Sequence, residues 1–177
     1  MIKQSGASVS VSPGSELRIG YGYPQVSEML AKSIPLGVSV DTSALTGSSS
    51  LFSALKLARD SENARAESEF KMTARKALEL GTIEGARSMG LDDKIGSLKP
   101  GKRADLIAIS PSALNMAVVT DPAHLVLEAT GAENVDTVVV DGRILKRGGK
   151  LATVDTPAVV AGARLALAGV RERTKWR

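Results

Sequence analysis

The first forty residues contain two segments with the pattern of a β-strand, and one helical segment separates them. Residues 9–12 alternate apolar and polar side chains, and residues 34–40 form an apolar, β-branched run. Residues 23–32 carry apolar side chains at helical spacing. This order predicts two parallel strands, because a helix supplies the long crossover that parallel strands need. Two parallel strands cannot close a barrel, which takes eight such strands and about 250 residues.

Three more helices are expected after the second strand. The first spans residues 51–59, with Ser50 in the N-cap position. The second spans residues 64–80, which are rich in Ala, Glu, Lys and Arg and have an amphipathic pattern. The third spans residues 82–89 and ends at Gly90. This part of the chain therefore has the pattern of an α/β barrel.

The character of the chain changes after these helices. Residues 95–98 and 104–109 read as short strands separated by a Pro-Gly turn. Residues 135–140 and 143–146 flank the dipeptide Asp141-Gly142, which is a strong signal for a hairpin with a type I′ turn. We therefore expect a small domain of antiparallel strands in this region.

A final helix is expected from Thr156, as N-cap, to about Arg173, with Pro157 at the first helical position. The densest basic stretch, residues 171–177, lies at the end of this helix, where cations complement the helix dipole. The other basic residues are scattered, and aromatic residues make up 3% of the chain. The net charge of +4 is therefore not interpreted as a nucleic-acid site.

The composition excludes several classes of protein. Cysteine is absent, so neither disulfides nor thiolate metal sites can form, and we expect a cytoplasmic protein. No apolar run reaches about eighteen residues, so no membrane span is expected. The first residues also lack the pattern of a secretory signal.

Four stretches resemble the amidohydrolase superfamily, in particular its cytosine deaminase, chlorohydrolase and guanine deaminase-like branch. Residues 36–42 (Leu-Gly-Val-Ser-Val-Asp-Thr) resemble the last barrel strand with its aspartate. Residues 72–87 resemble a helical segment that ends in a Thr-x-x-Gly-Ala pattern. Residues 90–106 closely match the signature Gly-Ser-Leu-x-x-Gly-Lys-x-Ala-Asp-Leu, and residues 138–143 resemble the hairpin that follows it. The resemblance covers residues 34–151 and concerns the carboxy-terminal portion of such enzymes.

The resemblance implies a fold of class α/β plus β. Residues 1–92 would be the incomplete carboxy-terminal part of a metal-dependent (β/α)8 barrel, residues 93–151 part of a small β-sandwich domain, and residues 152–177 a helix. The chemistry it implies is hydrolysis of a C–N or C–Cl bond in a small cyclic or amidine-like compound. Water bound to one or two divalent metals, zinc or iron, would be the attacking group.

The resemblance assigns the metal ligands to a His-x-His pair, further histidines and a terminal aspartate. Only Asp41 has a counterpart here, and it would touch the metal and accept a proton from the water in a completed barrel. The single histidine, His124, lies in the β region and is interpreted as structural or surface. One carboxylate cannot hold a catalytic metal, so we expect no bound metal and no turnover from this chain alone. A complementing amino-terminal chain or a homo-oligomer would supply the rest.

Other interpretations stay open for these residues. Asp41 could instead be a loop aspartate that accepts the backbone N–H groups of Thr42 and Ser43. Glu16 and Arg18 could line a substrate pocket, with Arg18 pairing an anionic group, or they could be solvated loop charges. The whole chain could be a non-catalytic interaction or assembly module, because open sheet edges and apolar faces recruit other chains.

Overall fold

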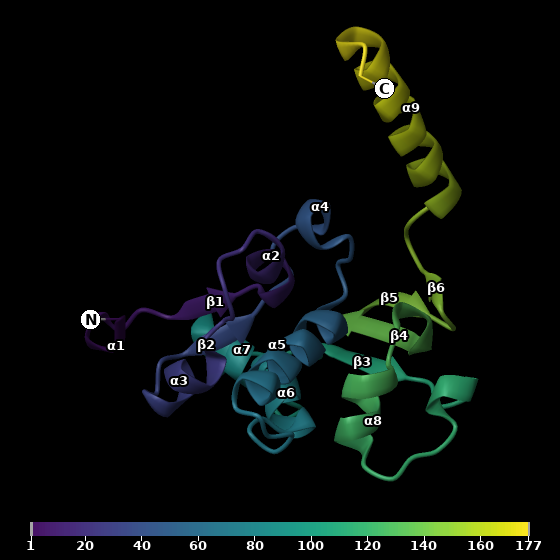
Figure 1. Cartoon of the computed structure of the whole chain (residues 1–177). Helices are drawn as coiled ribbons and strands as arrows, with labels where there is room; N and C mark the ends of the chain where they lie inside the picture. The colour runs from purple at the N-terminus through teal and green to yellow at the C-terminus, as the bar shows by residue number, and fades with distance from the viewer. Residues whose placement is uncertain (1, 177) are drawn as a thin grey trace.

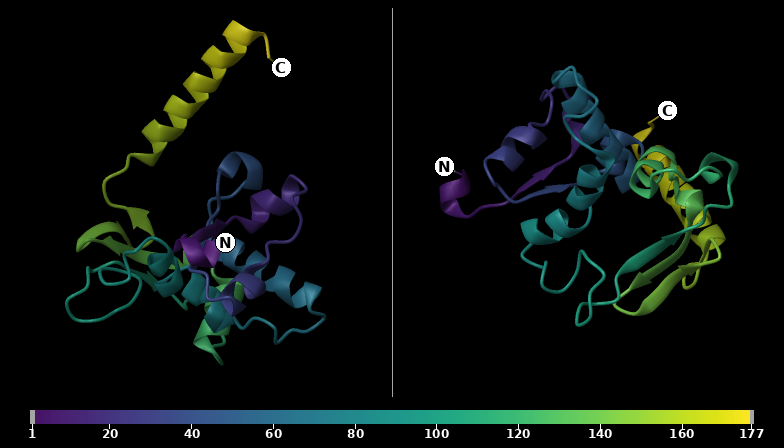
Figure 2. Two further views of the ribbon diagram at one scale, coloured as in Figure 1. Left: turned by 90° about the vertical axis from the view of Figure 1, so that its left-hand side faces the viewer. Right: turned by 90° about the horizontal axis from the view of Figure 1, so that it is seen from below.

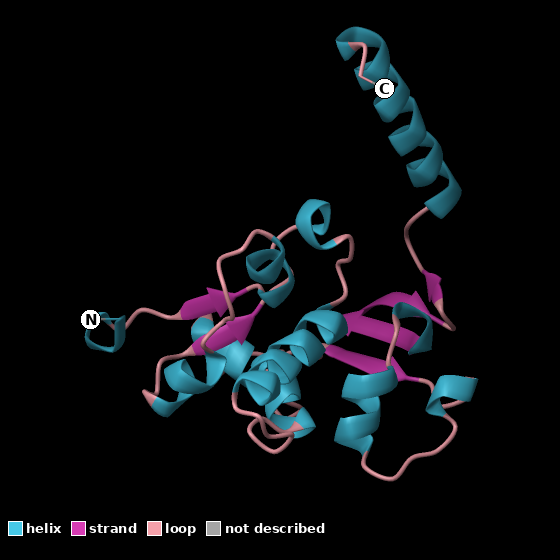
Figure 3. Cartoon of the chain, viewed as in Figure 1, coloured by secondary structure: helices cyan, strands magenta, loops and turns pink. Residues whose placement is uncertain are grey.

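The computed structural model describes residues 2–176 (Figure 1), and Figure 3 distinguishes its helices, strands and loops. The helices are α1 (Ile2–Ser5), α2 (Pro13–Arg18), α3 (Val26–Ala31), α4 (Ser43–Thr46), α5 (Leu51–Arg65), α6 (Ala74–Leu80), α7 (Ile83–Ser88), α8 (Pro122–Ala129) and α9 (Thr156–Thr174), with 3₁₀ turns η1 (Leu114–Met116) and η2 (Ala132–Asn134). The strands are β1 (Val9–Val11), β2 (Leu36–Val38), β3 (Leu106–Ile109), β4 (Val135–Val140), β5 (Arg143–Arg147) and β6 (Lys150–Leu151). Within this described part, no helix is long and apolar enough to cross a membrane.

The strands β1 and β2 form a parallel pair, which confirms the expectation from the strand–helix–strand order. Val9 lies opposite Leu36 and Val11 lies opposite Val38. The helix α3 lies in the crossover between the two strands, and α5, α6 and α7 contact β2. The buried core of this region consists of Val11, Val26, Leu36, Leu55, Met72, Ala77, Leu80 and Leu127. The parallel pair is therefore anchored by the helices that follow it.

The helix α5 begins where the sequence predicts. The hydroxyl of Ser50 caps it by accepting the N–H of Ser53 at 3.4 Å. Near its other end, the buried carboxylate of Glu62 accepts the N–H of Val26 at 3.0 Å. Glu62 also accepts a bond from Arg65 at 3.1 Å. Because Val26 is the first residue of α3, this carboxylate joins α5 to the start of the crossover helix.

The single long helix expected over residues 64–80 is wrong, because a loop separates α5 from α6. The side chain of Asn63 accepts the N–H of Met72 at 2.7 Å, which holds this loop against the end of α5. The hydroxyl of Thr73 then accepts the N–H of Lys76 at 3.2 Å and caps α6. The bond from the loop to the Asn63 side chain and the Thr73 cap of α6 outweigh the helical composition of the segment.

The strand expected over residues 95–98 is also wrong. This segment is a turn in which Gly96 has a φ of +81°, which does not fit a β-ladder. The ammonium group of Lys102 donates to the carbonyl oxygens of Asp92 and Ile95, the latter at 3.0 Å. The carbonyl groups of this segment are therefore bound by a lysine side chain and not by a neighbouring strand.

The remaining strands form one antiparallel sheet in the order β3–β4–β5–β6. The Asp141-Gly142 hairpin is confirmed, since both residues have positive φ angles, +51° and +77°. The N–H of Asp141 donates to the carboxylate of Asp105 at 2.6 Å. This bond ties the hairpin turn to the residue that precedes β3.

The N-cap of α9 lies one residue before the expected one. Its N-cap is Asp155 rather than Thr156, because the Asp155 carboxylate accepts the N–H of Ala158 at 3.0 Å. None of its side chains is buried, and the helix stands away from the rest of the molecule (Figures 1 and 2).

The helix α8, by contrast, packs on α5 and α6, and the sequence pattern does not anticipate it. It begins after Asp121, whose side chain caps it at 2.9 Å from the N–H of Ala123.

Candidate functional site

Asp41 lies just beyond the carboxyl end of β2, at the edge where β1 also ends. Its φ is +58°, and its side chain is exposed. Its own N–H donates to the hydroxyl of Ser39 at 3.1 Å. Among the described residues, none donates a hydrogen bond to the Asp41 carboxylate. The backbone N–H groups of Thr42 and Ser43, which were the donors in the alternative interpretation, do not donate to it either. The carboxylate is therefore available to a group from outside this chain.

Glu16 and Arg18 lie on α2, which follows the end of β1. The Glu16 carboxylate accepts the N–H of Ser12 at 2.7 Å and so holds the start of α2. The exposed Arg18 guanidinium donates to the carbonyl oxygens of Ala44, at 3.4 Å, and Leu45. Both side chains thus bind backbone groups, Glu16 at the start of α2 and Arg18 in α4, the helix that follows Asp41 in the sequence.

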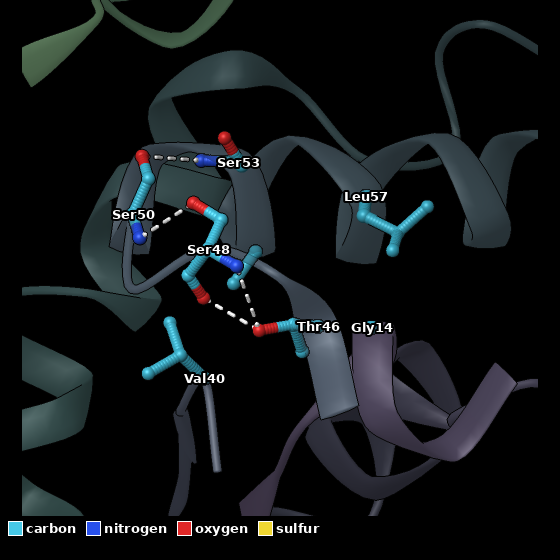
Figure 4. Close-up of a pocket in the computed structure, with 8 residues that line it drawn as sticks. Gly14, Val40, Thr46, Ser48, Ser50, Ser53 and Leu57 are labelled. Carbon is cyan, nitrogen blue, oxygen red and sulfur yellow. Dashed lines mark hydrogen bonds between the residues drawn. The ribbon is translucent and has the colours of Figure 1, made fainter. Parts of the chain in front are cut away.

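A small cavity of about 120 Å³ lies beside these loops (Figure 4). It is lined by Gly14, Val40, Thr46, Ser48, Ser50, Ser53, Ala54 and Leu57. Its hydroxyl groups bind within the loop: Ser48 accepts the N–H of Ser50 at 3.1 Å, and Thr46 donates to the carbonyl of Ser48 at 2.5 Å. No sequence pattern indicates this cavity, although the serine run at 48–50 lies in the loop that borders it.

A larger groove of about 860 Å³ separates the two sheets. The strands β1 and β2 and the helix α7 form one wall, and β3 and β4 form the other. The side chains of Leu106 and Ile107 on β3 are 38% and 48% exposed there. This groove is much larger than the cavity, and its walls come from segments that are distant in the sequence.

The described residues do not form a complete metal site. Across residues 2–176, no three His, Cys, Asp or Glu side chains are grouped so that they could hold a metal ion. The single histidine of the sequence, His124, is exposed on α8 and not at the ends of β1 and β2. A catalytic zinc is commonly held by three protein ligands, so Asp41 could contribute one of them.

A charge cluster joins α8 to α5. Glu128 forms salt bridges with Lys56, at 2.7 Å, and with Arg59. Burial acts to raise the pKa of Glu128, but the hydrogen bonds and charges of Arg59 and Lys56 outweigh it and lower the pKa to about 2. We interpret the cluster as a clamp between two helices, since each of its charges faces a partner.

The sequence matches the model of the amidohydrolase family over residues 1–145. The 5′-deoxyadenosine deaminase of Methanobrevibacter smithii is 30% identical over 177 residues, which are 99% of this chain and 40% of that protein. The S-triazine hydrolase of Gordonia rubripertincta is 34% identical over 162 residues, 89% of this chain and 33% of that protein. The chain therefore spans 40% or less of the length of these relatives.

Solved structures give the same result. An adenosine deaminase from Xanthomonas campestris with bound zinc superposes with a TM-score of 0.92 at 29% identity, over 97% of this chain and 39% of that chain. Atrazine chlorohydrolase from Arthrobacter aurescens, complexed with zinc, superposes with a TM-score of 0.82 at 27% identity, over 92% of this chain and 36% of that chain. Sequence and fold agree over most of the chain, which therefore belongs to the amidohydrolase family.

Proposed function

We propose that this chain is the carboxy-terminal portion of a metal-dependent hydrolase that cleaves a C–N or C–Cl bond in a small cyclic or amidine-like compound. Residues 1–92 contribute the last two strands of a (β/α)8 barrel, residues 93–151 part of a β-sandwich, and residues 152–177 a helix. The activities named for the relatives, deamination of adenosine-type nucleosides and hydrolysis of triazines, support this substrate class. We place the protein in the cytoplasm, where the absence of cysteine has no cost to stability.

Asp41 carries this proposal. Its exposed carboxylate follows the carboxyl end of a parallel strand, which is where barrel enzymes gather their catalytic groups. In the complete enzyme, Asp41 would be one of the groups that hold the divalent metal, zinc or iron, and its carboxylate would accept a proton from the attacking water. The metal, when bound, supplies an activated water molecule at neutral pH. The zinc in the similar deaminase and chlorohydrolase structures supports the choice of a divalent metal.

The other metal ligands come from outside this chain. One carboxylate and one distant histidine do not make a catalytic metal site, so the chain alone is inactive. A complementing amino-terminal chain, or a second copy in a homo-oligomer, supplies the remaining ligands. Glu16 and Arg18 border the substrate in the same proposal, because α2 directly follows the end of β1 and adjoins the loop of Asp41.

The test replaces the matched part of the Methanobrevibacter smithii deaminase by this chain and measures zinc content and deamination. We expect Asp41→Asn to lower turnover by about 10²–10⁴-fold, the range for loss of a general base. Asparagine tolerates the positive φ of this position, so circular dichroism and the melting temperature stay unchanged.

Asp93→Asn is the matched control. Asp93 is also exposed, and among residues 2–176 its carboxylate has no hydrogen-bond or ion-pair partner. We expect full turnover from this variant. Equal turnover of the Asp41→Asn and Asp93→Asn hybrids would contradict the role of Asp41, and turnover of a nucleoside or a triazine by this chain alone with zinc would contradict its inactivity.

The second candidate is a non-catalytic interaction or assembly module. The exposed apolar side chains of the antiparallel sheet favour it, among them Ile107, Val140 and Leu145 at 48%, 44% and 40% exposure. It predicts that the Asp41→Asn chain assembles normally and that no substrate is turned over in the assembled state. Light scattering combined with the turnover assay separates the two functions.

A further inference from the structure

The position of Asp41 depends on the strand that precedes it. Its side chain is exposed, and none of residues 2–176 donates a hydrogen bond to its carboxylate. The backbone before it is fixed, because the N–H of Ser39 donates to the carbonyl of Val11 at 2.8 Å. The Asp41 carboxylate therefore lies where β2 places it, so the contacts that hold β2 also set the position of this carboxylate.

The helix α7 lies against β2 (Figure 1) at a position that has no side chain. Gly37 is the central residue of this strand and is buried. A Cβ added to Gly37 would lie 2.8 Å from the hydroxyl oxygen of Ser88 and 3.3 Å from the Cα of Gly85. The Ser88 hydroxyl is itself held, because it donates to the carbonyl of Gly85 at 2.7 Å. Since protein interiors are close-packed, the missing side chain of Gly37 and the hydroxyl of Ser88 together set the separation of α7 and β2.

A second glycine contact holds the opposite face of α7. A Cβ added to Gly96 would lie 2.7 Å from the Cβ of Ala86 and 3.0 Å from the Cα of Ile83. Each helical residue turns by about 100° around the axis, so Ile83 and Ala86 face away from Gly85 and Ser88. The helix α7 is therefore enclosed between β2 on one face and the turn of Gly96 on the other.

The turn of Gly96 is in turn fixed to the antiparallel sheet. The ammonium group of Lys102 donates to the carbonyl oxygen of Ile95 at 3.0 Å. Asp105 follows on the same segment just before β3, and its carboxylate accepts the N–H of Asp141 in the hairpin at 2.6 Å. The hairpin, this turn, α7 and β2 therefore form a continuous series of contacts.

We propose that α7 positions Asp41 for its reaction, with Gly37 and Ser88 as the positioning residues at the contact with β2. A displacement of β2 moves the carboxylate relative to the groups that it serves, and a misplacement of about 1 Å can cost about 10²-fold in rate. Gly37 and Ser88 act through β2 and not by contact with the substrate. This inference rests on the proposed function for the reaction, but not for the effect on the position of Asp41.

A double-mutant cycle between positions 37 and 88 tests this contact. The φ of Gly37 lies outside the left-handed region, so Gly37→Ala acts by pressing a methyl group on the Ser88 hydroxyl and not through backbone strain. In the Gly37→Ala/Ser88→Ala variant that oxygen is absent, and the Cβ at position 88 is 3.8 Å away. Only the 3.3 Å contact with the Gly85 Cα stays tight. Gly162→Ala is the matched control, because no atom lies within 4 Å of its added carbon.

The first readout is the amide resonance of Asp41 in the nuclear magnetic resonance spectrum of the isolated chain, which needs neither metal nor substrate. Asp41 lies beyond the immediate neighbours of Gly37, so its resonance reports a displaced strand end. We expect Gly37→Ala to shift this resonance and Gly162→Ala to leave it in place. The double variant should return it to its position in Ser88→Ala. An unmoved resonance in Gly37→Ala, or a double variant shifted as far as Gly37→Ala, would overturn the proposal.

Circular dichroism checks that each variant folds. Should Gly37→Ala not fold, Ser88→Ala takes its place, because this substitution adds no atom and removes the oxygen that faces Gly37. The Asp41 resonance is then expected to shift in Ser88→Ala. A resonance that stays in place there would contradict the positioning role.

The second readout is turnover by the hybrid in which this chain replaces the matched part of the Methanobrevibacter smithii deaminase. We expect Gly37→Ala to lower kcat per folded molecule by about 10–10²-fold, with KM changed by less than about twofold, and the double variant to recover most of the loss. A contact that only stabilises the fold would lower the yield of folded hybrid and leave kcat per folded molecule unchanged, which would sink the positioning role. Full turnover by Asp41→Asn would instead remove the proposed chemistry, whereas a shifted Asp41 resonance in Gly37→Ala would still stand.

Discussion

Apolar side chains are buried to different extents in two regions: the helical region around β1 and β2, and the antiparallel sheet with α9. Val26, Leu36 and Leu80 in the first region are 0%, 1% and 0% exposed. Leu106 and Ile107 in the second are 38% and 48% exposed. The first region therefore has a core of its own, whereas the second leaves large apolar side chains partly exposed to solvent.

The largest difference is expected between two leucine truncations. Leu36→Ala opens a cavity in the core and should lower the free energy of unfolding by about 2–5 kcal/mol. Leu106→Ala on β3 should change it by less than about 1 kcal/mol in the free chain. Urea unfolding of both variants measures this. Equal losses would show that the two regions do not differ in the way described.

The buried carboxylate of the helical region gives the next effect. Glu62→Ala leaves the N–H of Val26 without its acceptor, which should cost about 1–3 kcal/mol. Glu69→Ala is the matched control, because Glu69 is exposed and its carboxylate has no partner among residues 2–176. Thermal unfolding of the two variants is the measurement. A control as unstable as Glu62→Ala would remove Glu62 from its assigned role.

The clamp between α5 and α8 predicts that the stability of the folded chain depends on pH. Since the pKa of Glu128 falls from its ordinary value of 4.5 to about 2 in the folded chain, its contribution to stability is complete above pH 4.5. That contribution is lost as the pH falls from 4.5 towards 2. Glu128→Gln should flatten the acid limb of the stability curve over this window. If Glu128→Gln loses as much stability at low pH as the unaltered chain, other carboxylates cause the acid limb.

The smallest effect belongs to the hairpin of the second region. Gly142→Ala places a side chain at a φ of +77°, and no atom lies within 4 Å of the added carbon. The loss of about 1 kcal/mol therefore comes from backbone conformation alone. Gly162→Ala in α9, also with open space around it, should cause no loss. Amide hydrogen exchange along β4 and β5 reports the first change and exchange along α9 reports the second, and a stable Gly142→Ala hairpin would contradict the type I′ turn.

Local signals with a direct physical cause predict much of this fold. The Asp141-Gly142 turn and the Ser50 cap lie where the sequence indicates, because each depends on a few neighbouring residues. The break before Thr73 and the turn at Gly96 have no recognisable sequence pattern, since they depend on a cap and on a lysine bond that composition does not reveal. The helix α8 is missed although Asp121 and Pro122 are a recognisable start.

The candidate site is predictable only in part. The place of Asp41 shortly after an apolar strand is predictable from the sequence, whereas its role at a metal comes from family resemblance and stays a prediction. Arg18 binds carbonyl groups of α4, and such a contact between distant segments has no sequence signature, whereas Glu16 binds the nearby N–H of Ser12. Their role towards a substrate stays a prediction. The groove between the two sheets is likewise a product of tertiary packing alone.

The metal content of the purified chain tests the central claim most directly. The chain is equilibrated with zinc, passed through a desalting column and analysed by mass spectrometry of its metals. Because Asp41 is not grouped with other metal ligands among residues 2–176, we predict far less than one zinc per isolated chain, rising to stoichiometric binding once the other ligands are supplied. One tightly held zinc per isolated chain would contradict the account.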